Sequence, residues 1–351
     1  MAIELSNLTF TDEDDIVPAS GVEEILNTGI ANTLAGDDKI TGTGGTYSIE
    51  NSGTLNTADG NDVIIGVSNS QEGNTLYSYG IFNRYGSTLN TGDGTDIIIG
   101  IGYGPNDYSI DGIFNQGIIN TGEDDDIITG THSYSGINNN DYGIIDTGNG
   151  SDTITGTGRS FGVQNYSTFN TGDGNDKITG NANFSGFGIV NSGTMDTGAG
   201  DDEITGTNTG TTTFCLGIYN TSGNTIDTGD GNDKITGTGG TDGINNNGII
   251  KTGKGKDSII ADGGFNGTGS VLLENGKDYL KGFGSGNFNG GKGKDTLELT
   301  PGSYTVGISG TAVNFTNGST IMNTSDFEKL IAGSTTYDFS SLTDGQTIFV
   351  S

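Results

Sequence analysis

One stretch decides the fold of this chain: residues 169–180 read Phe-Asn-Thr-Gly-Asp-Gly-Asn-Asp-Lys-Ile-Thr-Gly. The same stretch returns almost unchanged at 226–237. In every copy a glycine-rich acidic turn ends in Asp, and Ile follows two residues later. Such self-similarity indicates a repeat architecture in which each unit buries its apolar face against its neighbours. Looser copies occur at 55–66, 89–100, 119–130, 145–156, 195–206 and 250–261.

The copies between residues 25 and 261 keep one register. Each key Asp has Ile two residues later and Thr five residues earlier, with another apolar residue two positions before the Thr. Farther upstream comes a third apolar position, followed two residues later by Asn. Disordered low-complexity sequence would not hold such a register. The key residues of these copies are Asp38, Asp62, Asp96, Asp126, Asp152, Asp176, Asp202, Asp233 and Asp257.

The three apolar positions sit in short runs that are rich in Ile and Thr and broken by Gly. Their period-two neighbours are typical of strands and not of helices. We therefore predict an all-β fold, a right-handed parallel β-helix with three-sided coils of 24 or more residues. The recurring Asn should form a ladder of side-chain amides along one corner.

The chain divides into four segments on the same pattern. Residues 1–24 hold one short alternating run and an acidic patch, and we expect them to cap the first coil. Residues 25–261 form the nine-coil solenoid, and 262–300 form narrower coils because the turns ending at Asp278 and Asp295 follow at shorter spacing. Residues 301–351 lack such turns and are expected to form a C-terminal β cap with a short helix near 325–331.

The composition excludes several classes of function. The 44 acidic and 13 basic residues give a net charge of −31, which should repel nucleic acid and anionic membranes and attract cations. A single Cys excludes an intrachain disulfide, so metal is the obvious alternative staple. No apolar run is long enough to span a membrane, and the first residues lack the basic and apolar regions of a Sec signal peptide.

The repeated turn reads Thr-Gly-x-Gly-x-Asp, and we number these positions one to six. Its glycines permit backbone conformations that turn carbonyl groups toward one point. Carbonyl and carboxylate oxygens together suit a hard divalent cation. Without a cation, the stacked carboxylates would lie about 5 Å apart and repel one another. The pattern therefore predicts one row of calcium sites along the rod.

With this motif, residues 34–300 resemble the RTX, or hemolysin-type calcium-binding, repeat proteins. In that family an ion lies between the turns of adjacent coils. One turn supplies the carbonyls of positions two and four and the Asp carboxylate; its neighbour supplies the carbonyls of positions one and three and often the side chain of position five. Since each coil here has one such turn, the resemblance implies one row of up to about ten ions.

Carried over residue by residue, the resemblance implies a defined set of calcium ligands. This sequence departs from the family by having Thr at position one, and lysines in the turns ending at Asp257 and Asp295 make those two sites less favourable. The implied metal-binding residues are Asp38, Asp62, Asp96, Asp126, Asp152, Asp176, Asp202, Asp233, Asp257 and Asp295, with Gly60, Gly94, Gly150, Gly174, Gly200 and Gly231, and with Asn61, Asp125, Asn175, Asp201 and Asn232 at position five.

The expected function follows from the resemblance. It implies a secreted, non-enzymatic protein that folds on binding calcium and has a structural or adhesive role outside the cell. The C-terminal segment is similar to those RTX proteins that leave through a type I channel without a Sec signal, which implies an extracellular or cell-surface location. The expected partners are calcium ions and an extracellular polysaccharide or cell-surface component, and not nucleic acid.

Two alternatives remain at this point. One is an ice-binding β-solenoid, because Thr-x-Thr pairs follow the Ile in five coils and resemble the flat threonine arrays of such proteins. The other is a β-helix enzyme acting on polysaccharide, such as a lyase or epimerase. That activity would need a basic cluster in a groove, whereas His132 is the only His and Arg84 and Arg159 are the only Arg.

Overall fold

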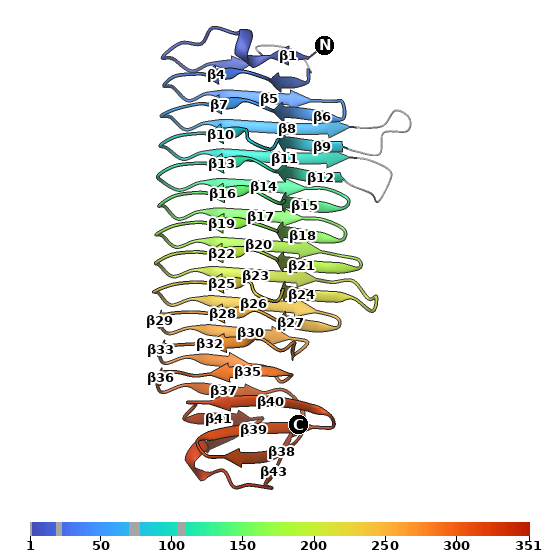
Figure 1. The fold of residues 1–351 in the computed structure, drawn as a ribbon, viewed down its shortest axis with the longest axis vertical. Helices are drawn as coiled ribbons and strands as arrows, with labels where there is room; N and C mark the ends of the chain where they lie inside the picture. The colour runs from blue at the N-terminus through green and yellow to red at the C-terminus, as the bar shows by residue number, and fades with distance from the viewer. Residues whose placement is uncertain (1, 19–22, 70–77, 104–109) are drawn as a thin grey trace.

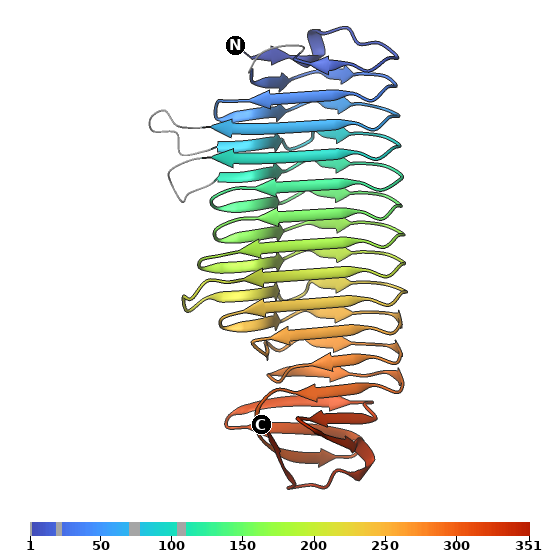
Figure 2. The ribbon, with the colours of Figure 1, turned by 180° about the vertical axis from the view of Figure 1, so that it is seen from behind.

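The computed structural model describes residues 2–18, 23–69, 78–103 and 110–351. The chain forms a rod of stacked coils, with the N-terminal coil at one end and a group of C-terminal hairpins at the other (Figure 1). Each coil passes through one strand of sheet A, one strand of sheet C, a six-residue turn and one strand of sheet B, and then returns to sheet A. Figure 2 shows the same stack from behind.

Sheet A lies at the side where each coil begins, and its described strands pair in parallel. They are β1 (Ile3–Glu4), β3 (Ile25–Asn27), β6 (Tyr47–Asn51), β9 (Ser78–Asn83), β12 (Ile110–Asn115), β15 (Ser135–Asn139), β18 (Phe161–Asn165), β21 (Gly186–Asn191), β24 (Cys215–Asn220), β27 (Asp242–Asn246) and β31 (Phe265–Asn266).

Sheet C follows sheet A in each coil. Its strands, in chain order, are β4 (Ile30–Asn32), β7 (Thr54–Asn56), β10 (Thr88–Asn90), β13 (Ile118–Asn120), β16 (Ile144–Asp146), β19 (Thr168–Asn170), β22 (Thr194–Asp196), β25 (Thr225–Asp227), β28 (Ile249–Lys251), β32 (Ser270–Leu272), β35 (Gly286–Asn289), β38 (Gly302–Ser309), β39 (Ala312–Asn317), β40 (Thr320–Ser325) and β43 (Thr347–Val350).

Sheet B completes each coil. Its strands are β2 (Ile16–Val17), β5 (Lys39–Thr43), β8 (Val63–Asn69), β11 (Ile97–Tyr103), β14 (Ile127–Thr131), β17 (Thr153–Thr157), β20 (Lys177–Ala182), β23 (Glu203–Asn208), β26 (Lys234–Gly239), β30 (Ser258–Asp262), β34 (Tyr279–Lys281), β37 (Thr296–Leu299), β41 (Lys329–Ala332) and β42 (Thr335–Asp338). Three short strands form sheet D in the turns: β29 (Lys254–Gly255), β33 (Asn275–Gly276) and β36 (Lys292–Gly293).

The described strands pair as a three-sided parallel β-helix, so the predicted fold class is confirmed. Each side contributes one apolar residue per coil to a continuous core; in one coil these are Ile49, Leu55 and Ile64, all at most 1% exposed. Each such side chain contributes about 1.5–3 kcal/mol by its burial. Sheets A and B approach closely because glycines face each other: a Cβ at Gly180 would lie 2.2 Å from the carbonyl oxygen of Gly188.

The Asn ladder is present at the corner after each sheet A strand. The side-chain amide of Asn165 donates to Oδ1 of Asn191 at 2.8 Å, and also to the backbone carbonyl of Thr194 at 2.8 Å. The same double contact recurs at Asn191, which donates to Asn220. Because these side chains are buried and bonded to one another, they fix the coil register, and Oδ1 of Asn27 at the start of the ladder is its one oxygen without a partner among the described residues.

The end of the chain departs from the coil pattern. Strand β40 pairs in parallel with β35, while β38, β39, β40 and β43 pair antiparallel to one another and cover the last coil. The expected short helix near 325–331 is wrong, because β41 begins at Lys329 and continues sheet B beyond β37. Phe327 and Leu330 are buried at the end of the stack, which an extended segment allows.

Two short 3₁₀ helices complete the described elements, η1 (Leu5–Asn7) and η2 (Phe339–Ser341). At the N-terminal end, β1 and β2 pair with β3 and β5, so residues of the segment 1–24 add a partial coil to the stack. Residues 1 and 19–22 of that segment lie outside the described residues. Among the described residues, no helix is both long and apolar enough to cross a bilayer.

Candidate metal centre

The turns between sheets C and B bring the key Asp residues into one column. The backbone N–H of Asp152 donates to Oδ1 of Asp176 at 2.9 Å, and that of Asp176 donates to Oδ1 of Asp202 at 2.8 Å. This contact repeats from Asp15 to Asp295 without a break. Each carboxylate of the column therefore holds the turn of the preceding coil through one of its two oxygens.

The second oxygen of these carboxylates is buried, and in most coils it has no partner. Oδ2 of Asp152 accepts from the Thr147 hydroxyl at 2.5 Å, and Oδ2 of Asp202 accepts from Thr197 at 2.6 Å. An unpaired buried acceptor costs free energy, so a column of them calls for a compensating group. Within the described residues, Oδ2 has no hydrogen bond in Asp38, Asp62, Asp96, Asp126, Asp176, Asp233, Asp257, Asp278 and Asp295.

Burial raises the pKa of these carboxyl groups. It raises the pKa of Asp176 to about 6, that of Asp202 to about 7 and that of Asp126 to about 8, mainly because the charged form loses water. Neighbouring carboxylates add to the shift; Asp96 and Asp152 do so for Asp126. Hydrogen bonds from Thr and from the backbone act in the opposite direction but are smaller. A bound cation would favour the ionised form of all of them.

Most of the turns that carry the unpaired carboxylate oxygens also contain backbone carbonyls without hydrogen-bond partners in the described part of the chain. The position-two and position-four carbonyls of the turn at Gly172 and Gly174 accept no hydrogen bond within the described residues, and the same holds for Gly148 and Gly150. Each points at the glycine of the next coil: a Cβ at Gly174 would lie 1.6 Å from the oxygen of Gly150. Glycine is therefore required here by the stacking of carbonyl oxygens against the next turn.

These unpartnered oxygens could supply part of the ligand set of a hard cation such as calcium. We call the turns that end at Asp38 to Asp233 the open turns, because their position-two and position-four carbonyls accept no backbone hydrogen bond within the described residues. Most of them offer three oxygens without a partner among these residues, one carboxylate oxygen and two carbonyls; in the turns of Asp152 and Asp202 the carboxylate oxygen is bonded to Thr. Such oxygens are the ligands that calcium prefers. Other groups of the family's ligand set are already bonded: the position-three carbonyl of Ala199 accepts from Gly174 N–H at 2.8 Å. No cluster of three or more His, Cys, Asp or Glu side chains occurs among the described residues, because the column supplies one key carboxylate per coil.

The position-five side chains form a second ladder on the outside of the turns. Oδ1 of Asn175 accepts from Asp201 N–H at 2.7 Å, and Oδ1 of Asp201 accepts from Asn232 N–H at 2.7 Å. Asn61 and Asp125 accept backbone N–H groups in the same way. All five side chains are exposed. Asp125 and Asp201 each have a second carboxylate oxygen outside the ladder, whereas the single side-chain oxygen of Asn61, Asn175 and Asn232 is already used in it.

The predicted glycines lie where the resemblance requires. Five of the six have φ values between +132° and +157°, which only glycine adopts without strain. These five are Gly60, Gly94, Gly150, Gly174 and Gly200, and Gly231 occupies the equivalent position in its turn. Non-glycine residues at such positions are strained: Leu34, Ala58 and Asp124 have φ values of 70°, 64° and 79°.

The last three turns, which end at Asp257, Asp278 and Asp295, are built differently, and we call them the lysine turns. The carbonyls of the first two are closed by hydrogen bonds: Asn275 N–H donates to Gly253 at 2.9 Å, and Lys292 N–H donates to Glu274 at 2.6 Å. These bonds make sheet D. The structure thus places Asp257 in the carboxylate column but in a closed turn. Asp295 lies in the same column, and the Gly291 and Gly293 carbonyls of its own turn accept no backbone hydrogen bond within the described residues.

Sequence reasoning missed the two ends of the column. Asp295 N–H donates to Oε2 of Glu328, a residue of the C-terminal cap. Asp15 supplies the first N–H, which Asp38 accepts. Glu328 belongs to no repeat, so no periodic signal could have assigned it. Asp15 stands 23 residues before Asp38, close to the shortest period, and this spacing was the available signal.

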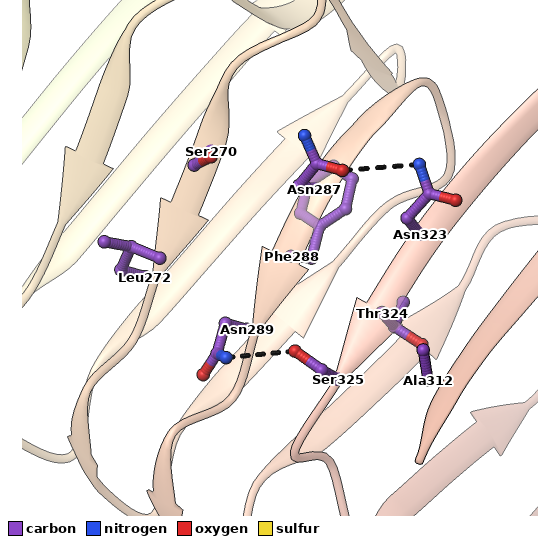
Figure 3. A pocket seen from close by; sticks show the side chains of 9 residues that line it. All are labelled: Ser270, Leu272, Asn287, Phe288, Asn289, Ala312, Asn323, Thr324 and Ser325. Carbon is purple, nitrogen blue, oxygen red and sulfur yellow. Dashed lines mark hydrogen bonds between the residues drawn. The ribbon is translucent and has the colours of Figure 1, made fainter. Parts of the chain in front are cut away.

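A groove outside the turns lies at the seam between the last coils and the C-terminal hairpins. It encloses about 330 Å³ and is lined by amides, hydroxyls and the Phe288 ring. Figure 3 shows that Asn287 contacts Asn323 and that Asn289 contacts Ser325 across this seam. The groove holds no titratable lining residue, so its contacts serve to join β35 to β40.

Comparison with known proteins gives a likeness to solved structures. No family model matches the chain, and no curated protein matches its sequence. A similar solved structure is the X-ray crystal structure of a hyperactive, Ca²⁺-dependent, β-helical antifreeze protein from an Antarctic bacterium. The alignment covers 85% of this chain and 77% of that chain at 15% identity, with a TM-score of 0.38. At this sequence identity and TM-score, the likeness gives no information about function.

Fold and site together define the class: a parallel β-solenoid with one column of buried carboxylates in stacked glycine-rich turns. The open turns, from Asp38 to Asp233, and the lysine turns divide that column into two parts.

Proposed function

We propose that the chain is a calcium-binding solenoid of the RTX kind, whose open turns take up calcium and so complete its folding. The observation that carries the proposal is the row of buried Asp oxygens without partners, in turns whose position-two and position-four carbonyls also accept no hydrogen bond within the described residues. Bound calcium would supply the positive charge that the column lacks. The residues that would hold it are the key Asp and the position-two and position-four carbonyls of the open turns.

The chain's own residues prepare these sites. Ile178, two residues after Asp176, is buried in the core and anchors one end of the turn. The bond from Asp176 N–H to Asp202 orients the next carboxylate. Gly172 and Gly174 let the carbonyls of adjacent turns stack at close range. Binding restricted to the folded state stabilises that state by mass action.

We further propose a non-enzymatic, structural or adhesive role outside the cell, after export without a Sec signal. Extracellular calcium sites work at about 10⁻⁴–10⁻³ M, a concentration that the cytosol does not reach. Calcium would therefore fill the column only after export. The net charge of −31 supports this order, because it opposes compaction until cations bind.

The test is folding as a function of calcium. Circular dichroism in EDTA should show little β-structure, and millimolar calcium should restore it cooperatively. Magnesium at equal concentration is the control, since it dehydrates reluctantly and demands near-octahedral geometry. A chain that is fully β-structured in EDTA and gains no stability on adding calcium would overturn the proposal.

Ice binding is a second candidate, favoured by one observation on sheet B. Side chains on the outer face of sheet B, all Thr except Asn181, stand in register over five successive coils, from β14 to β26, although the hydroxyls of Thr179 and Thr236 are themselves buried. Ile65 and Ile99 extend one column over β8 and β11. The columns are Thr129, Thr155, Thr179, Thr205 and Thr236, and Thr131, Thr157, Asn181, Thr207 and Thr238.

Thermal hysteresis of the calcium-loaded protein tests this candidate. Thr179→Lys should abolish the activity, because Thr179 lies in the middle of the array. Thr168→Lys, on the outer face of sheet C, is the matched control and should leave the activity unchanged. Absence of hysteresis and of ice recrystallisation inhibition in the wild-type protein would exclude ice binding and leave the calcium proposal untouched.

A further inference from the structure

The turns at the C-terminal end of the solenoid carry exposed positive charge, whereas the preceding turns carry negative charge. The three lysine turns carry five of the 13 basic residues of the chain. Sheet D sets them in register, and Figure 1 places β29, β33 and β36 one after another along the same edge of the rod. One column consists of Lys254, Asn275 and Lys292. A second column, two residues later in each turn, consists of Lys256, Lys277 and Lys294. We call these five lysines the lysine ridge.

Elsewhere, basic side chains are mostly paired with carboxylates. Lys177 and Lys234 both contact Glu203 at 2.9 Å, and Lys281 contacts Glu298 at 2.9 Å. On the ridge, Lys254 contacts Asp230 at 2.5 Å. The other four lysines of the ridge are exposed and make no ion pair with any described residue: Lys256, Lys277, Lys292 and Lys294.

The ridge does not serve as counter-charge for the carboxylates beneath it. Burial raises the pKa of Asp278 to about 7, and the nearby charges that act on it are those of Asp257 and Asp295, which raise it further. No lysine lowers the pKa of Asp257, which burial raises to about 6. The ammonium groups of the lysine ridge therefore face solvent and do not pair with the buried carboxylates. Glu274 is the one acidic side chain exposed at position two of these turns.

We propose that the lysine ridge binds a linear polysaccharide that carries carboxylate groups on its sugars. The two columns repeat at the strand spacing of about 4.8 Å, so they present cations in straight rows. An extended chain with evenly spaced carboxylates can contact several of them at once. The proposal specifies the partner of the adhesive role proposed above, although the ridge itself requires no calcium.

The flanks of the ridge argue for a polymer of modest charge density. Asp230 lies on one side, and Asp326 and Glu328 lie beyond the last coil on the other. A nucleic acid, with one charge per about 1.7 Å of duplex, would extend over these acidic flanks and be repelled. A polyuronate places its charges farther apart and can be bound over the ridge alone.

The experiment measures binding of a short galacturonate oligomer by calorimetry, with the full chain in calcium. The test variant is Lys256→Gln, Lys277→Gln and Lys294→Gln together. The matched control is Lys177→Gln, Lys234→Gln and Lys281→Gln, which changes the net charge equally but removes paired lysines. The test variant should weaken binding about tenfold, as expected for three exposed charge pairs, and the control should not.

Circular dichroism of both variants in calcium shows that they are folded, so loss of binding is separable from loss of calcium-dependent folding. Equal weakening in both variants, no binding by the wild-type chain, or equal binding of a neutral dextran overturns the proposal. Two other results also overturn it in favour of another partner. One is tighter, ridge-dependent binding of a single-stranded oligonucleotide. The other is ridge-dependent self-association in sedimentation without oligomer binding.

Discussion

The backbone N–H of Asp295 donates a hydrogen bond of 2.7 Å to Oε2 of Glu328. A glutamate of the C-terminal cap thus takes the place that the Asp of the next coil takes elsewhere in the column. At the other end, Asp15 gives its N–H to Asp38, while its own carboxylate accepts from Thr11 N–H at 2.8 Å. The carboxylate column therefore has defined ends, a donor at the first coil and an acceptor in the cap.

Glu328→Ala should lower the free energy of unfolding by about 1–3 kcal/mol, because Asp295 N–H loses its acceptor in a part-buried setting. Glu328→Gln keeps an acceptor oxygen and should recover most of that loss. Guanidinium unfolding in calcium measures both. If the Gln variant is as unstable as the Ala variant, the charge of Glu328 and not its hydrogen bond is what matters.

Asp176→Asn should separate the two roles of the column. Asn keeps an oxygen for Asp152 N–H but removes a carboxyl group whose pKa burial raises to about 6. In EDTA at pH 8 the variant should therefore retain more β-structure than wild type, as measured by circular dichroism. In calcium it should need a higher ion concentration to fold, because a calcium ligand is lost.

Asp257→Asn is the control for that prediction. Burial also raises the pKa of Asp257 to about 6, so this variant too should gain β-structure in EDTA. Its turn is closed by the bonds from Asn275 N–H to Gly253 and from Lys277 N–H to Gly255, so the calcium midpoint should not move. A shift of the calcium midpoint as large as that of Asp176→Asn would show that the lysine turns also bind the ion.

The sequence pattern predicted the coil well because each inward position repeats. Ile154, Ile178 and Ile204 are all buried where the register put them, and the Asn ladder follows from the same period. The bond from each Asp N–H to the next carboxylate was not predictable, since it depends on how far adjacent turns are offset. The cap was predicted least well, because Phe327 and Leu330 occur once and carry no period.

Gly174→Ala should strongly destabilise the fold. Its φ is 157°, and the added Cβ would lie 1.6 Å from the carbonyl oxygen of Gly150. Gly223→Ala is the control, because Gly223 has a φ of 83° and nothing within 4 Å of the added atom, so it bears backbone strain alone. That strain costs about 1–2 kcal/mol. Chemical denaturation should show the Gly174 variant to be the less stable of the two, and equal losses would mean that the turns can move apart.

Ala58→Gly should stabilise the protein for the converse reason. Ala58 occupies position two of its turn with a φ of 64°, a conformation that glycine adopts without cost. The gain should be about 0.5–1 kcal/mol after allowing for the greater freedom of glycine in the unfolded chain. Thermal unfolding in calcium measures it. A lower melting temperature would indicate that the methyl group of Ala58 makes a packing contact that outweighs the strain.

Asp111 gives a prediction on pH that does not involve the turns. It is 3% exposed on β12, where Asn138 donates to its Oδ2 at 3.2 Å while Oδ1 has no partner among the described residues. Burial raises its pKa to about 7. Because the folded-state pKa lies above the unfolded value, its contribution to stability is full below pH about 4 and is lost as the pH rises through about 7.

Asp111→Asn removes that dependence. The difference in unfolding free energy, variant minus wild type, should rise between pH 4 and pH 8 by up to about 4 kcal/mol, the equivalent of three pKa units. Asp242→Asn is the matched control, because Asp242 lies in the same outward position of sheet A and is half-buried. Denaturation at several pH values in saturating calcium, where the proteins are folded, measures both differences, and the other carboxyl groups cancel because wild type and variant share them. A difference for Asp111→Asn that stays flat with pH would mean that water or a cation reaches Oδ1 of Asp111 and keeps its pKa near the unfolded value.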